Sequence, residues 1–103
     1  MPQLITVFWR DIPAQVIAKE RRISEKVQLS ERFAEAIDAA AMRAGKGGTD
    51  AYLEEWKRVP TSCGEDLKAE AEAEAARLEA EYDREKLIAL VKNEGHMPDQ
   101  NSK

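Results

Sequence analysis

The feature that most constrains the fold is a pair of short apolar runs near the N-terminus, separated by a proline. In the first run, residues 4–10, apolar side chains occupy both faces of an extended chain, which predicts an interior strand. Asp11 and Pro13 interrupt the pattern, since aspartate favours turns and proline has no backbone N–H. Residues 14–19 then resume the extended pattern with a β-branched centre. We therefore predict a β-hairpin, followed by a polar connector over residues 21–26.

The middle of the chain is predicted to be helical. Ser30 is a candidate N-cap for a helix over residues 31–44, in which apolar side chains recur at helical spacing. Gly45 is the expected stop of this helix, because glycine readily adopts the left-handed conformation that ends helices. A short second helix is predicted to begin with Thr49 as its cap and to end at Pro60.

The C-terminal third carries two apolar stripes that one straight helix cannot bury together. Ser62 and Glu65 have the spacing of a capping box and predict where this helical segment begins. Its first stripe extends over residues 67–82, and at 100° per residue a second stripe falls on the opposite side. The second stripe consists of Leu87, Leu90 and Val91. We favour a break of the helix near Tyr82, with Asp83 as a new N-cap. The alternative is that the second stripe meets a partner, which would allow a homo-oligomer.

These elements predict an α+β fold in which an N-terminal β-hairpin, a small antiparallel sheet, packs against three to four helices. Helices are needed because an isolated hairpin is only marginally stable in water. The 103 residues suffice for one domain, which we place at residues 1–95, with a flexible tail at 96–103. No apolar run approaches the ~20 residues that span a bilayer. The single cysteine, Cys63, fits a reducing compartment, so we expect a cytoplasmic protein without membrane contact.

Side chains suited to catalysis are scarce. The one histidine, His96, lies in the predicted tail, so a histidine-based catalytic pair or a zinc site lacks its groups. The glycine-rich residues 44–49 lack the spacing of a phosphate-binding loop and are better explained as a helix stop and cap. Cys63 has no general base near it in sequence, and the carboxylates between residues 65 and 81 are typical of a solvated helix face. We expect no catalytic residue, metal or cofactor in the chain on its own.

Charge is distributed unevenly along the chain. The formal net charge is −4, yet residues 1–32 carry six basic and four acidic side chains, whereas residues 61–103 carry six basic and eleven acidic ones. Four of the six basic side chains of the N-terminal part form a candidate patch, and they are Lys19, Arg21, Arg22 and Lys26. Next to the aromatic residues 8 and 9, this patch suggests a nucleic-acid surface. The acidic balance of the whole chain argues against that interpretation, and the same patch would also suit the acidic surface of a partner protein.

Three segments of the sequence resemble a known family. Residues 9–16 (WRDIPAQV), 36–45 (AIDAAAMRAG) and 49–56 (TDAYLEEW) are similar to the small bacterial virulence factor domain, which also occurs within the larger virulence factor C proteins. The likeness extends over about residues 3–95. Stand-alone members of this family tend to be encoded near methylenetetrahydrofolate reductase-like and corrinoid methyl-transfer proteins. The resemblance therefore implies an accessory role in one-carbon metabolism, and it offers no catalytic motif to carry over.

The same segments contain the candidate partner-binding residues. The first places a tryptophan beside an ion pair, and the third places two large aromatic residues on a helix too short to stand unless docked. We hypothesise that they converge on one surface, because tryptophan, tyrosine and arginine are enriched at binding hot spots. The candidate residues are Trp9, Arg10, Asp11, Tyr52 and Trp56. The alternative is that the aromatic residues are simply the core of a small domain.

Three classes of function stay open from the sequence. The first, which we prefer, is a non-enzymatic accessory or adaptor protein that binds another protein, such as a folate- or corrinoid-dependent enzyme. The second is a small nucleic-acid-binding regulator of virulence genes that uses the basic patch within residues 10–26. The third is a subunit that contributes Arg10 and Asp11 to the active site of a partner enzyme.

Overall fold

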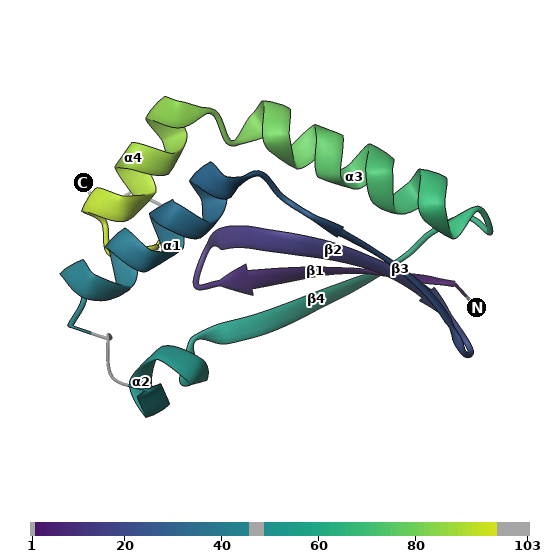
Figure 1. Ribbon diagram of the computed structural model, residues 1–103, viewed down its shortest axis with the longest axis horizontal. Helices are drawn as coiled ribbons and strands as arrows, with labels where there is room; N and C mark the ends of the chain where they lie inside the picture. The colour runs from purple at the N-terminus through teal and green to yellow at the C-terminus, as the bar shows by residue number, and fades with distance from the viewer. Residues whose placement is uncertain (1, 46–48, 97–103) are drawn as a thin grey trace.

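The computed structural model describes residues 2–45 and 49–96 and has the predicted α+β architecture (Figure 1). Its four strands form one antiparallel sheet in the order β3-β2-β1-β4. The elements in chain order are β1 (Gln3–Trp9), β2 (Ile12–Glu20), β3 (Ile23–Gln28), α1 (Glu31–Arg43), α2 (Thr49–Glu54), β4 (Trp56–Ser62), α3 (Leu67–Glu81) and α4 (Arg84–Lys92).

The predicted hairpin is the centre of this sheet. β1 pairs with β2 on one side and with β4 on the other, which confirms that the first apolar run is an interior strand. The register of β1 and β2 shifts after Val7, so Ala14 is an extra residue in β2. The turn between them places Arg10 at a φ of +54°, in the left-handed region that side chains other than glycine seldom adopt.

Two predictions about the edges of the sheet were wrong. Residues 21–26 were expected to be a polar connector, but Ile23–Gln28 is the edge strand β3. The helix predicted to extend to Pro60 ends at Glu54, and Trp56–Ser62 is the other edge strand, β4. An edge strand accommodates Pro60 because its outer side has no strand partner that needs an N–H.

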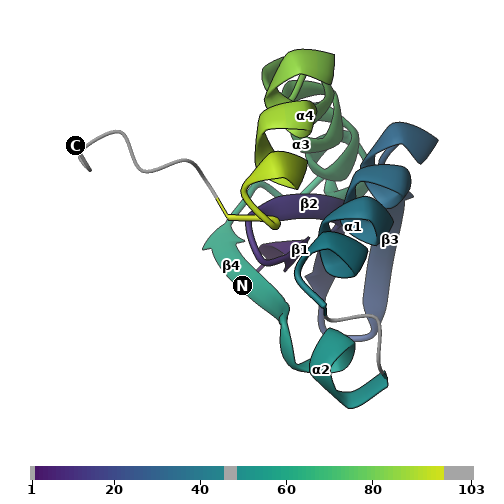
Figure 2. The ribbon, with the colours of Figure 1, turned by 90° about the vertical axis from the view of Figure 1, so that its left-hand side faces the viewer.

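The helices cover one face of the sheet. Helices α1, α3 and α4 lie on the same side of it (Figures 1 and 2), where α3 packs on β2 and β3 and α1 packs on β2 and α4. The main core lies between these layers, and its largest fully buried side chains include Trp9, Ile12, Phe33 and Leu90. A second, small cluster of Ile5, Val7 and Ile17 forms apart from this core.

The ends of the helices follow partly from the sequence. Helix α1 is confirmed, but the Ser30 hydroxyl donates to a Glu79 carboxylate oxygen at 2.8 Å instead of capping the helix. Gly45 follows α1 with a φ of +74°, as expected of a helix stop. The Thr49 side chain, the other predicted cap in this region, lies outside the described residues. The capping box predicted at residues 62 and 65 was wrong, because Asp66 caps α3 by accepting from the Ala69 N–H at 3.2 Å.

The predicted break in the C-terminal helix is present. Asp83 caps α4 and accepts from the Lys86 N–H at 2.9 Å. The change of direction turns Leu87 and Leu90 into the main core, with Val91 packed against it. The second apolar stripe is therefore accounted for within one chain, and a homo-oligomer through these residues stays a prediction. Of the predicted tail, residues 96–103, all but His96 lie outside the described residues.

Candidate functional site

The aromatic residues singled out in the sequence converge in space. The rings of Trp9 and Tyr52 stack with centroids 5.8 Å apart, and Tyr52 meets Trp56 edge-on at the same distance. The Trp9 indole N–H also donates to the Tyr52 carbonyl oxygen at 2.9 Å. This cluster joins the end of β1, helix α2 and the start of β4, and the short helix α2 is thereby docked.

Arg10 is enclosed next to this cluster. Only 8% of its side chain is exposed, its guanidinium lies 5.2 Å from the centre of the Trp9 ring, and it forms an ion pair with Glu55 at 3.3 Å. It also donates to the Glu94 carbonyl oxygen at 2.8 Å. Arg10 therefore ties the β1–β2 turn to the start of β4 and to the segment after α4.

The segment after α4 closes over the same turn. The Asp11 N–H donates to the Gly95 carbonyl oxygen at 2.8 Å, and the Asp11 carboxylate pairs with Lys57 at 3.2 Å. Gly95 has a φ of +92°, and a Cβ at this position would lie 2.9 Å from a Trp9 ring carbon. Only glycine fits this close approach without strain. We call the group of Trp9, Arg10, Glu55 and Gly95 the Arg10 cluster.

Within the aromatic cluster, exposure divides the candidate residues. Trp9 is fully buried, whereas Tyr52 and Trp56 are half-buried. Trp56 separates two hollows, one of about 490 Å³ shared with Tyr52 and one of about 550 Å³ shared with Val7 and Arg58. Burial, with the nearby Asp38 carboxylate, raises the pKa of the Tyr52 phenol, which stays protonated at neutral pH. Tyr52 and Trp56 are thus the two aromatic members that a partner is able to reach.

The sheet face opposite the helices has a distinct composition. Its centre is the small apolar cluster of Ile5, Val7 and Ile17, against which Trp56 packs. Strand alternation places Lys19 on the same face as Ile17. The register adds Lys26, which is the cross-strand partner of Ile17, and Arg58, which is the partner of Val7. We call this the open face. Its remaining strand positions are Gln3, Gln15, Ser24, Gln28, Pro60 and Ser62.

The open face is cationic without compensation from its own strands. None of the strand positions on this face is a carboxylate, although the chain as a whole carries a net charge of −4. Lys19, Lys26 and Arg58 are exposed, and none has an ion-pair partner among residues 2–45 and 49–96. These charges are therefore available to an external acidic group.

The predicted basic patch is divided between two places. Lys19 and Lys26 belong to the open face, whereas Arg21 and Arg22 form the exposed turn between β2 and β3, with Arg21 at a φ of +58°. No sequence pattern indicates that Arg58 joins them, because β4 was not predicted. Its signal is the cross-strand pairing with Val7, which only the fold reveals.

The described residues offer little for catalysis. No group of three or more metal-ligating side chains occurs in the part of the chain that the structure describes. Burial raises the pKa of the Cys63 thiol, and the carboxylates of Glu70 and Glu20 raise it further, which opposes a nucleophilic thiolate. Among the described helices, none is long and apolar enough to cross a membrane. The distinct surface that the geometry presents is the exposed, cationic open face.

The fold and this surface define a class of small α+β protein, with a four-stranded antiparallel sheet that is covered by helices on one face and cationic on the other. The chain belongs to the virulence factor family, whose model matches residues 7–91. This match confirms the family resemblance seen in the sequence. No curated protein and no solved structure matches the chain.

Proposed function

We propose that the protein is a cytoplasmic, non-enzymatic accessory protein that binds the acidic surface of a partner protein through its open face. One observation carries the proposal: Lys19, Lys26 and Arg58 surround an apolar centre on a sheet face whose strand positions include no carboxylate. Trp56 lies at the end of this face and forms a wall of the adjoining hollow. An apolar centre with an aromatic anchor and a charged rim is the usual composition of a protein interface.

The charge of the rest of the molecule supports this orientation. An acidic partner is repelled by the net negative charge of the chain and attracted only where the cations are uncompensated. The open face, where three such cations lie together around an apolar centre, therefore favours both the docking site and the direction of approach. Long-range attraction of this kind weakens as salt screens it, over about 10 Å at 0.1 M ionic strength.

The class of partner rests on the family resemblance. The resemblance implies an accessory role in one-carbon metabolism, so the first candidates are folate- or corrinoid-dependent methyl-transfer enzymes. In this proposal the protein adds a docking surface to such an enzyme and supplies no reacting group of its own.

The test is a mild pull-down of the tagged protein from its native cell extract, with partners quantified by mass spectrometry. We expect one stoichiometric protein partner, lost with the double variant Lys19→Glu and Lys26→Glu. A matched control is Lys68→Glu with Lys92→Glu, which places the same charge change on exposed positions of the helical layer. Equal capture by both double variants, or no partner at all with a monomeric protein, contradicts the proposal.

A nucleic-acid-binding regulator is the second candidate, and the same charges favour it. With Arg21 and Arg22 at the hairpin turn, the β2–β3 hairpin and Arg58 present five exposed cations that have no ion pair within the described segments. Binding of a labelled single-stranded oligonucleotide that weakens steeply with salt would support it. Reversal of Arg21 and Arg22 separates the two functions, because it lowers oligonucleotide binding and leaves a partner on the open face in place.

A further inference from the structure

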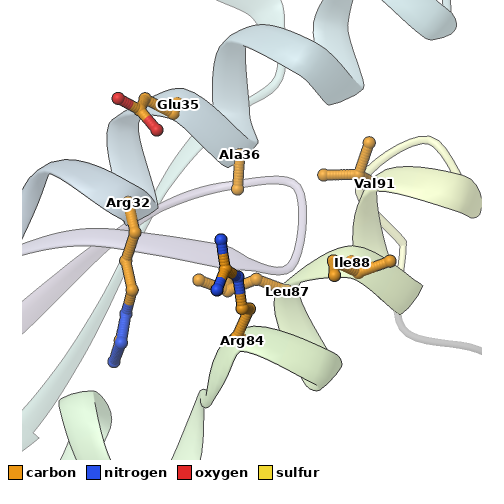
Figure 3. Close-up of a pocket in the computed structure, with 7 residues that line it drawn as sticks. All are labelled: Arg32, Glu35, Ala36, Arg84, Leu87, Ile88 and Val91. Atoms are coloured by element: carbon orange, nitrogen blue, oxygen red, sulfur yellow. The ribbon is translucent and has the colours of Figure 1, made fainter.

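A groove on the helical side of the molecule is not explained by the proposed function. It has a volume of about 540 Å³ and lies between α1 and α4 (Figure 3). Its lining residues are Arg32, Glu35 and Ala36 from α1, and Arg84, Leu87, Ile88 and Val91 from α4. Because α1 and α4 lie on the covered side of the sheet (Figure 1), this groove is on the opposite side from the open face.

The groove follows the direction of the two helices. Arg32 and Arg84 lie in the first turns of α1 and α4, and at the other end Arg43 donates to the Lys92 carbonyl oxygen at 3.2 Å. The helices therefore run in the same direction. The floor consists of Ala36, Leu87 and Val91, with Ile88 beside them, 48% exposed. This is an apolar trough open to solvent along one side.

Two arginine side chains lie at one end of the groove, and only one of them forms an ion pair with a described carboxylate. Arg84 is exposed, has no carboxylate within ion-pair distance among the described residues, and reaches across the floor toward Ala36 (Figure 3). Arg32 forms an ion pair with the Glu79 carboxylate at 3.1 Å. Its Nε is buried and has no hydrogen-bond acceptor in the described part of the chain.

The carboxylates near this end of the groove leave Arg84 as the group that attracts an acidic ligand. The single acidic lining residue, Glu35, points away from Leu87 and Ile88 (Figure 3). Both amino-terminal ends already have a carboxylate of the chain, because Glu79 accepts from the Ser30 N–H before α1 and Asp83 caps α4. The attraction for an acidic group that enters the groove therefore comes from Arg84, which has no ion-pair partner among the described residues.

We propose that this groove binds an amphipathic helix of a partner protein, with apolar side chains on Ala36, Ile88 and Val91 and an acidic side chain paired with Arg84. Charge complementarity argues for an acidic segment. A helix fits because the floor consists of side chains on two helices, with no free strand edge between them to extend, and helices dock into apolar grooves through residues three and four apart. The trough is open along Ile88, whereas small-molecule sites enclose most of their ligand.

Together with the proposed function, an occupied groove would make the protein a two-sided adaptor. The open face and the groove lie on opposite sides of the sheet, so two occupants do not compete for space. This inference does not depend on the proposed function, because no residue of the groove belongs to the open face.

The test uses a displayed library of helical peptides selected for binding to the intact protein. We expect enrichment of peptides with apolar residues three and four apart and with acidic residues on the flanking positions. The best synthetic peptide should bind at least about tenfold more weakly to Arg84→Glu and to Ile88→Asp. Amide chemical-shift changes with this peptide should concentrate on α1 and α4. Both substituted positions are exposed, and circular dichroism of each variant checks that the fold is retained.

Matched controls keep this test separate from that of the open face. Lys68→Glu makes the same charge change outside the groove, and Lys19→Glu with Lys26→Glu alters only the open face, so neither should change peptide affinity. Enriched peptides that are basic, that bind Arg84→Glu as well as the unmodified protein, or that shift residues outside α1 and α4 overturn the proposal. Failure of the selection to enrich any peptide sensitive to Ile88→Asp overturns it as well.

Discussion

The Arg10 cluster and the open face contain the same kinds of side chain, but the cation is enclosed in the first and the cations are exposed in the second. Each brings tryptophan and basic residues together, yet in the Arg10 cluster the guanidinium of Arg10 pairs with the Glu55 carboxylate and donates to the Glu94 carbonyl oxygen. Lys19, Lys26 and Arg58 of the open face have no described ion-pair partner. A cation beside an aromatic ring therefore does not by itself indicate a binding site. What distinguishes the two regions is whether the chain supplies its own carboxylate and covering segment.

The largest expected difference between the regions is in the role of their tryptophans. Trp9→Ala should lower the free energy of unfolding by ~3–5 kcal/mol, because it empties a fully buried site and removes the hydrogen bond to Tyr52. Trp56→Ala should lower it by about half as much, since the side chain is half-buried, and should weaken partner capture. Urea denaturation followed by circular dichroism measures both effects. Equal destabilisation would mean that Trp56 is core and not an anchor.

The basic residues should differ almost as sharply. Arg10→Met removes two charge-assisted contacts of an enclosed guanidinium, the ion pair with Glu55 and the hydrogen bond to the Glu94 carbonyl oxygen, so we expect a loss of ~3 kcal/mol of unfolding free energy. Lys26→Met on the open face should change stability by less than ~0.5 kcal/mol, because the ammonium is exposed and unpaired within the described chain. Denaturant titration of the two variants side by side is the measurement. A large effect at Lys26 would show that the open face stabilises the fold.

The comparison also shows how far the sequence determines the structure. The sequence predicts β1, β2 and α1 because each buries a periodic apolar pattern. It predicts the break before α4 because one straight helix cannot bury both apolar stripes of the C-terminal third. It does not predict β3 and β4, since most side chains of these edge strands are exposed and leave no alternation to detect. An edge strand is defined by its neighbour in the sheet, and no local pattern specifies that neighbour.

The site was predictable to the same extent. Residue type, within the segments that resemble the family, singled out Trp9, Tyr52 and Trp56, and the structure brings them together. The burial of Trp9 depends on Gly95, which lies far along the chain, beyond α4, and closes over the β1–β2 turn. The open face depends on the β1–β4 register, which sets Arg58 beside Val7. Both are pairings between residues far apart in the sequence, and periodicity along the chain does not detect them.

Substitutions of two glycines test whether the segment after α4 closes over the Arg10 cluster. Gly95→Ala adds a methyl group 2.9 Å from the Trp9 ring at a left-handed φ, so we expect a loss of about 2–3 kcal/mol in unfolding free energy. Gly45→Ala introduces the same strain at a φ of +74° with no atom within 4 Å, and should lose only about 1 kcal/mol. Thermal and urea unfolding give the difference between the two variants. If the two variants are equally destabilised, backbone strain explains the result and the segment after α4 does not close over the Arg10 cluster.

The smallest expected effect concerns pH and separates the core side of the sheet from the open face. Burial raises the pKa of the Tyr82 phenol above its ordinary value of 10, and the carboxylates of Glu81 and Asp11 add to the shift while Arg77 opposes it. The phenolate is thus less favourable in the folded than in the unfolded state. The stability that this tyrosine contributes is complete below pH 10 and is lost as pH rises through the higher folded-state pKa.

Stability measured by urea titration from pH 8 to 11 should therefore fall above about pH 10, and Tyr82→Phe should flatten that fall while changing little at pH 8. The open-face variant Lys19→Met is the control, because Lys19 is exposed and has no described carboxylate partner to lose at high pH. A steeper alkaline fall in Tyr82→Phe than in the unmodified protein would contradict a raised pKa for the Tyr82 phenol. An unchanged fall would assign the transition to the phenol of Tyr52, whose pKa burial also raises, or to the thiol of Cys63.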